Sequence, residues 1–175
     1  MTKPPDDIQL DRPLEFRSAD GDLHVRIALA ALQRADRSCR LAHPLETGGI
    51  LAGYYSPNRD CALIERLSRA PLDSRRQRRS FQRGVRQLQT WLELLRKQHG
   101  MFYIGEWHYH PGTSVTPSRR DLTEMRVIAS SPAYNCPEPL LLILGASVCK
   151  PSRISVSIIP AVGERITLTP VEPAR

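Results

Sequence analysis

Four side chains able to bind a metal ion or transfer a proton lie close together in the stretch EWHYHPGTSVTPSRRDLTEM, residues 106–125. They are His108, His110, Ser118 and Asp121. Side chains alternate between the two faces of a β-strand, so His108 and His110 would project from the same face. Residues three apart share a face of a helix, which would align Ser118 with Asp121. A strand end facing a helix start can therefore present two nitrogens and one carboxylate oxygen to a single metal ion.

Three protein ligands of this kind leave the fourth position of a tetrahedral zinc ion open for water, as in catalytic zinc sites. Zinc bound there would lower the pKa of water toward about 7 and polarise a scissile carbonyl, while a base passes the proton to the leaving amine. Two glutamates are candidates for that base. Glu106 shares the face of the two histidines, and Glu46 begins the segment ETGGILAGYY, whose adjacent glycines would let the backbone run close to the site. Spacing alone does not choose between them.

Each of these residues also has a purely structural interpretation. Paired histidines on a strand are often partly buried polar residues, and Pro117 followed by Ser118-x-x-Asp121 is also a helix-capping pattern. Glu46 could serve only in a turn. Short motifs match by chance, so each residue taken singly favours the structural interpretation. Their combination favours the metal site, because the same elements supply a complete ligand set, a hydroxyl and a base.

The order of the predicted strands and helices along the chain indicates an α/β (α+β) fold. We expect one mixed sheet flanked by helices in a single domain. Helical periodicity predicts helices at 28–42, from Val85 to about Gly100, and at 117–130. Alternating or continuous apolar runs predict the strands, at 21–27, 46–55, 61–67, 101–110, 139–146, 153–160 and 164–170.

The ends of the domain and its compartment follow from composition. Residues 1–20 are rich in Pro, Asp and Arg without periodicity, which predicts a flexible N-terminal arm or a loosely attached edge strand before a domain at 21–172. The sequence has no apolar run long enough to cross a bilayer and no signal-peptide pattern, so we expect a cytoplasmic protein without a membrane partner. The four cysteines are widely scattered, which predicts reduced thiols, at Cys39, Cys61, Cys136 and Cys149.

The net charge of +7 is concentrated in one segment rather than spread over the chain. Six arginines fall within twelve residues, in the segment 75–86, which is predicted to be a loop leading into a helix. Such a run is usually a solvated face, and that interpretation is favoured. An acidic partner, with nucleic acid as the first candidate, is the functional alternative.

The sequence resembles the JAB/MPN (JAMM) zinc metalloprotease family. The family signature is a glutamate, then His-x-His, seven residues and Ser-x-x-Asp, and it is matched by Glu46, His108, His110, Ser118 and Asp121. The segment ETGGILAG and the proline after the second histidine are also similar to the family, and the resemblance covers roughly residues 21–170. It implies the MPN/JAB-type fold, which is cytidine-deaminase-like. Tyr109 departs from many eukaryotic members, which carry Ser or Thr there, and we expect it to face away from the metal.

The resemblance also implies a role for each matching residue. His108, His110 and Asp121 would bind Zn²⁺, Glu46 would be the general base and proton shuttle, and Ser118 would hydrogen-bond the oxyanion. This implies Glu46 rather than Glu106 by analogy. Family members cut the bond that joins the C-terminus of a ubiquitin-like protein to a lysine. Small stand-alone bacterial members occur beside E1-like and E2-like enzymes in antiphage defence, so the expected substrate is a ubiquitin-like protein or a conjugated partner protein.

Three other functions compete with this one. Relatives associated with DNA repair carry a similar pattern, and the arginine excess would suit phosphate contacts, although few aromatics lie near the basic run. A non-catalytic MPN scaffold would be expected to lack ligands, and none is missing here. A cysteine hydrolase needs a thiolate paired with a histidine, and none of the cysteines has a local signature for that role.

Overall fold

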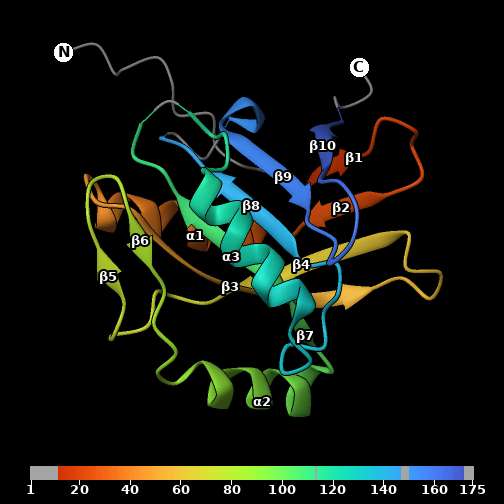
Figure 1. Cartoon of the computed structure of the whole chain (residues 1–175), viewed down its shortest axis with the longest axis horizontal. Helices are drawn as coiled ribbons and strands as arrows, with labels where there is room; N and C mark the ends of the chain where they lie inside the picture. The colour runs from red at the N-terminus through yellow and green to blue at the C-terminus, as the bar shows by residue number, and fades with distance from the viewer. Residues whose placement is uncertain (1–11, 113, 147–149, 172–175) are drawn as a thin grey trace.

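A mixed sheet that closes on itself forms the centre of the computed structural model, which describes residues 12–112, 114–146 and 150–171. Neighbouring strands follow the order β1-β10-β9-β8-β7-β3-β4-β2, and β1 pairs back onto β2 (Figure 1). The pairs β2–β4 and β7–β8 are parallel and the others are antiparallel. The strand bounds are β1 Leu14–Arg17, β2 His24–Ile27, β3 Thr47–Tyr55, β4 Cys61–Leu67, β7 Phe102–Tyr109, β8 Leu140–Leu144, β9 Ile154–Ile158 and β10 Ile166–Pro170.

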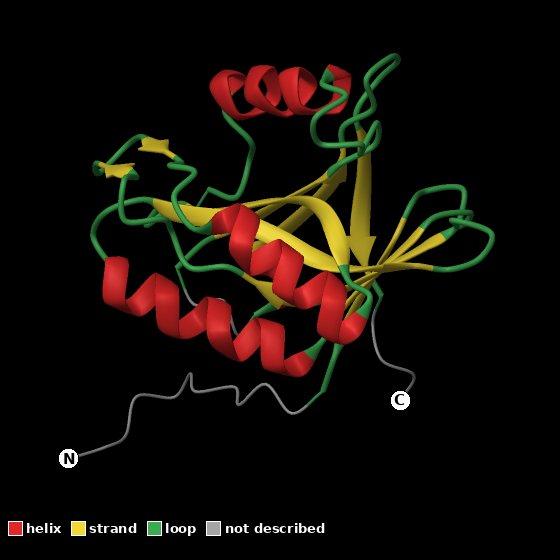
Figure 2. Cartoon of the chain, turned by 90° about the horizontal axis from the view of Figure 1, so that it is seen from below, coloured by secondary structure: helices red, strands yellow, loops and turns green. Residues whose placement is uncertain are grey.

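Among the described residues, three α-helices flank this sheet on two sides (Figure 2). They are α1 Leu29–Ala42, α2 Leu88–His99 and α3 Arg119–Ser130, and a short 3₁₀ helix, Pro151–Arg153, precedes β9. The apolar face of α1 joins the main core, with Leu32, Ala35 and Cys39 buried there. That face is the one its sequence periodicity predicts.

Strand β8 shows why this sheet must be covered on two sides. All five of its residues are apolar and buried. Leu140, Leu142 and Leu144 belong to the main core, while Leu141 and Ile143 pack against Met125 of α3. A strand buried on both faces is expected to be continuously apolar. This packing fixes α3, and therefore its first turn, against the strand that neighbours β7.

The predicted fold class is confirmed, and the differences concern short elements. The segment 1–20 was predicted to be a flexible arm or a loosely attached edge strand. Residues 14–17 form a strand, β1, but it pairs with both β2 and β10 and so is not at an edge; residues 1–11 lie outside the described part. A small separate hairpin, β5 Arg75–Arg76 and β6 Phe81–Gln82, was not predicted. The predicted start of a helix at Val85 was wrong, because Gln87 adopts a left-handed conformation and α2 begins at Leu88.

Within the described ranges, none of the helices combines the length and apolarity that a membrane crossing requires. The three described cysteines, Cys39, Cys61 and Cys136, are free thiols, as predicted, and Cys149 lies outside the described residues.

Candidate metal centre

The side chains of His108, His110 and Asp121 converge at the end of β7 and the start of α3. One candidate ligand atom from each lies within 4.8 Å of the others. His108 Nδ1 is 2.8 Å from Asp121 Oδ1, and His110 Nε2 is 3.7 Å from Asp121 Oδ2. The three side chains are 8%, 16% and 10% exposed, so they form a shielded cluster at the protein surface rather than a solvated one.

Asp121 is fixed by the first turn of α3 as well as by the histidines. Ser118 is the N-cap residue, and its Oγ accepts a hydrogen bond from the Asp121 N–H at 3.1 Å. In return, the Ser118 N–H donates to Asp121 Oδ2 at 2.7 Å, which completes a capping box. The capping interpretation of Ser-x-x-Asp is therefore correct at this position, and the same box aims the carboxylate at the two imidazoles.

The electrostatics of the cluster favour the ionisation states that bind a metal. Burial opposes charge on Asp121, but the His108 ring and the bonds from Ser118 prevail and hold the pKa of the Asp121 carboxyl well below its usual range. Burial lowers the pKa of His110, with the Asp121 charge opposing this effect and His108 adding to it. A metal binds carboxylate and neutral imidazole, so both shifts reduce the competition from protons.

Strand β3 runs against β7 at close range here, as its glycines predict. Gly48 pairs with His108, and a Cβ at position 48 would meet the Trp107 carbonyl, Phe81 Cε1 at 2.7 Å and His108 Cδ2 at 3.0 Å. The rings of Phe81 and His108 pack in a T-shaped arrangement, with centroids 5.6 Å apart. Glycine at position 48 therefore leaves the space in which Phe81 holds the imidazole in place. Tyr109 faces the core as predicted, 3% exposed.

Glu46 directly precedes β3, whose first residue, Thr47, pairs with Tyr109. This register brings Glu46 to the end of the sheet that carries His110. Its side chain is half-buried, and burial together with the charge of Asp121 raises the pKa of its carboxyl, against the opposing effects of His108 and Arg120. The Glu46 carboxyl is therefore within electrostatic range of Asp121 and His108 and has a raised pKa.

Glu106, the other candidate base, is engaged in a different structure. It is 2% exposed, its Oε2 accepts a hydrogen bond from Arg83 Nε at 2.6 Å, and its Oε1 accepts one from the Tyr103 hydroxyl at 3.0 Å. Arg83 also donates to the Tyr134 hydroxyl at 2.9 Å. Both oxygens of Glu106 are thus occupied, although burial still raises its pKa. The structure therefore distinguishes the two glutamates, which spacing alone did not.

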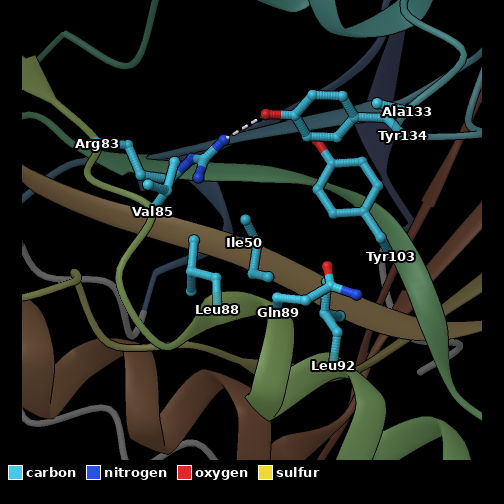
Figure 3. Close-up of a pocket in the computed structure, with 9 residues that line it drawn as sticks. All are labelled: Ile50, Arg83, Val85, Leu88, Gln89, Leu92, Tyr103, Ala133 and Tyr134. Atoms are coloured by element: carbon cyan, nitrogen blue, oxygen red, sulfur yellow. Dashed lines mark hydrogen bonds between the residues drawn. The ribbon is translucent and has the colours of Figure 1, made fainter.

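This buried network forms one wall of a pocket of about 340 Å³. Figure 3 shows Arg83 reaching toward Tyr134 with Tyr103 beside them, and the apolar side chains of Leu88 and Leu92 opposite. No local motif in the sequence indicates it, because Arg83, Glu106 and Tyr134 are far apart along the chain. Arg83, read in the sequence as part of a solvated run, is instead largely buried.

The donor set at the cluster fits a zinc ion. Two imidazole nitrogens and one carboxylate oxygen are ordinary zinc ligands, and three of them are the number found in catalytic zinc sites. Histidines that bind metals are usually oriented by neighbouring groups, and here Phe81 and Gly48 orient His108 while the capping box orients Asp121.

The closed mixed sheet and the cluster between β7 and α3 can now be compared with known protein families. The model of the family described as prokaryotic homologs of the JAB domain matches residues 25–159, and the chain belongs to that family. The matched range includes the whole cluster and Glu46. The predicted family is therefore confirmed.

The chain is also similar to individual proteins. The chain is 39% identical, over 82% of its own length and 79% of the other protein, to a CD-NTase/cGAS isopeptidase from Enterobacter hormaechei subsp. hoffmannii (strain UCI 50). It is 33% identical to a probable metalloprotease, y4qB, from Sinorhizobium fredii (strain NBRC 101917 / NGR234), over 58% of the chain and 63% of that protein. The solution structure of protein DSY2949 from Desulfitobacterium hafniense shares the fold, with a TM-score of 0.56 at 21% identity, covering 83% of this chain and 88% of that one.

Proposed function

We propose that the protein is a zinc-dependent isopeptidase that releases a conjugated protein by cutting after its C-terminus. The observation that carries the proposal is the convergence of His108, His110 and Asp121 within 4.8 Å. The relative named as a CD-NTase/cGAS isopeptidase supports this reaction class and the choice of a conjugated protein as substrate. The conjugated protein would be a CD-NTase or a ubiquitin-like protein, attached to lysine by an E1-like and E2-like pathway of antiphage defence.

Each residue of the signature has a task in this reaction. His108, His110 and Asp121 would hold the zinc ion, which supplies a Lewis acid that polarises the scissile carbonyl and acidifies water. Glu46 takes the proton from the attacking water and delivers it to the leaving lysine amine. Ser118 accepts one bond from the Asp121 N–H, so its own hydroxyl proton can be donated to the developing oxyanion.

The decisive experiment uses Glu46, because its assigned role requires the carboxylate but not the metal. We expect wild-type protein to contain about one zinc per chain and to cleave a CD-NTase or ubiquitin-like protein fused through its C-terminus to a fluorescent protein. Glu46→Gln should keep the zinc and lose about 10²- to 10⁴-fold in kcat/KM. Glu93→Gln, an exposed site on α2, is the matched control and should keep full activity. Equal cleavage by Glu46→Gln and wild type would remove Glu46 from this role.

A cysteine hydrolase is a weaker candidate on the same evidence. Cys39 and Cys136 are buried, and burial raises the pKa of both thiols, which opposes formation of a thiolate nucleophile. Burial also raises the pKa of Cys61, which is half-buried. Cleavage that survives thiol alkylation but stops with a zinc chelator would separate the two mechanisms in favour of the metal.

A further inference from the structure

A second pocket, of about 370 Å³, lies between α1, the segment that follows β4 and the start of α2. Its polar wall contains three exposed arginines from three different elements, Arg34, Arg69 and Arg86. Its apolar wall includes Leu72, which is 80% exposed, and the half-buried Trp91. We refer to this pocket as the arginine pocket.

The three arginines of the arginine pocket make no ion pair within the described residues. Asp73, whose charge interacts with that of Arg86, accepts hydrogen bonds from the backbone N–H groups of Val85 and Arg86 at 3.0 and 3.1 Å. Three guanidinium groups that share one pocket, with no carboxylate among the residues that line it, favour an anionic ligand.

The arginine pocket is connected by hydrogen bonds to the strand that carries His108 of the candidate metal centre. Ser68, which lines the pocket, accepts a hydrogen bond from Trp107 Nε1 at its carbonyl, at 3.1 Å. Its hydroxyl accepts another from the Ile50 N–H at 2.9 Å. Trp107 directly precedes His108 on β7 and is fully buried. A protein held in the pocket would therefore contact a segment that is hydrogen-bonded to the strand carrying His108.

We propose that the arginine pocket binds an acidic segment of the protein conjugate, with its carboxylates on Arg34, Arg69 and Arg86 and an apolar side chain against Leu72 and Trp91. This proposal rests on the proposed isopeptidase function and names the feature by which the enzyme recognises its substrate. Exposed arginines beside exposed apolar and aromatic groups are typical of protein interfaces. Non-specific binding of single-stranded nucleic acid uses a series of aromatic faces, whereas Trp91 is the one aromatic residue among those that line this pocket.

The test measures binding first, so that it does not depend on cleavage. The probe is a short fluorescein-labelled peptide of alternating glutamate, leucine and serine, and binding to the full chain is followed by anisotropy. The triple variant Arg34→Gln/Arg69→Gln/Arg86→Gln should bind it about tenfold more weakly than wild type. A charge-matched triple variant at exposed arginines outside the pocket, Arg26→Gln/Arg126→Gln/Arg165→Gln, should bind as wild type does.

Specificity controls complete the binding test. Replacing glutamate by glutamine in the peptide should abolish binding, and raising the salt concentration should weaken it. Equal loss in both triple variants, or equal binding of the glutamine peptide, would overturn the proposal. Tighter binding of a single-stranded oligonucleotide than of the acidic peptide, lost in the pocket variant alone, would overturn it in favour of nucleic acid.

Cleavage then tests the link to the substrate. With the conjugate as substrate, the pocket variant should raise KM about tenfold and leave kcat unchanged, because the arginines act in docking and not in chemistry. An unchanged KM would overturn the link even if the peptide binds. Failure of the proposed function looks different: wild-type protein would then cleave no conjugate, while the peptide data would still decide whether the pocket binds acidic segments.

Discussion

Two charged clusters involve neighbouring side chains of β7, Glu106 in one and His108 in the other, and they have opposite characters. At the candidate metal centre, His108, His110 and Asp121 bring three potential metal ligands together. Two residues earlier, Glu106 is paired with Arg83 and both of its oxygens are occupied. Three metal-ligand side chains that face one another can bind an added ion. The ion pair of Arg83 and Glu106 has no such capacity left, and its role is structural. The comparison shows that burial and a perturbed pKa do not by themselves identify a catalytic carboxylate.

Removing a ligand should have the largest effect. Asp121→Asn keeps an oxygen that can accept the Ser118 N–H bond, so we expect the fold to persist. It loses the carboxylate ligand, and zinc content and cleavage should fall together, with activity down at least about 10³-fold. Metal analysis and fusion cleavage measure this, with the exposed Asp22→Asn as control. Full zinc content in Asp121→Asn would contradict the ligand assignment.

Breaking the ion pair between Arg83 and Glu106 should lower the stability of the fold. Arg83→Met leaves the Glu106 carboxylate buried without a cation, which should lower the free energy of unfolding by about 3–5 kcal/mol. Urea denaturation measures the change. The double variant Arg83→Met/Glu106→Gln removes the unpaired charge and should recover part of the loss. A change below about 1 kcal/mol in the single variant would mean that the pair does not support the fold.

Substitution of Ser118 should reduce both activity and stability, each by less than the two substitutions above. Ser118→Ala removes the oxyanion donor and the N-cap of α3, so we expect kcat to fall about 10²-fold and stability to fall by about 1 kcal/mol. Zinc content should stay at the wild-type level. Ser131→Ala, at the other end of α3, serves as the control. A loss of stability without a loss of kcat would reduce Ser118 to its capping role.

The smallest effect is the titration of the two carboxyls of the site in metal-free protein. Carboxyl ¹³C NMR should place the Glu46 pKa above its ordinary value, because of burial and the Asp121 charge, and the Asp121 pKa below its own. The contributions of these two carboxyls to the free energy of unfolding change with pH in opposite directions. Asp121 contributes stability above its unfolded pKa, and this is lost as pH falls through the lowered pKa; Glu46 favours folding in acid and opposes it as pH rises past its raised pKa. If the Glu46 and Asp121 carboxyls titrated with the same midpoint, the predicted difference between their pKa values would be wrong.

Sequence reasoning succeeded where the information is local. His108 and His110 share a strand face, Ser118 and Asp121 share a helix start, and the short return between them leaves few ways to arrange the four. It failed where contacts join distant segments. The pairing of Arg83 with Glu106 and the two partners of β1 depend on tertiary packing that no periodicity reports. Val85 matched the apolar face of the following helix, yet the left-handed Gln87 excludes it from α2.

The capping box at Ser118 and Asp121 affects how sequences of this kind should be compared. The two residues stabilise the start of α3 whether or not an ion is present, so selection for a stable helix alone can preserve them. The histidines of β7 have no such second duty in the helix. A homologue that has lost its chemistry would therefore be expected to keep Ser-x-x-Asp and to change His-x-His first, which makes the strand, rather than the helix, the diagnostic half of the signature.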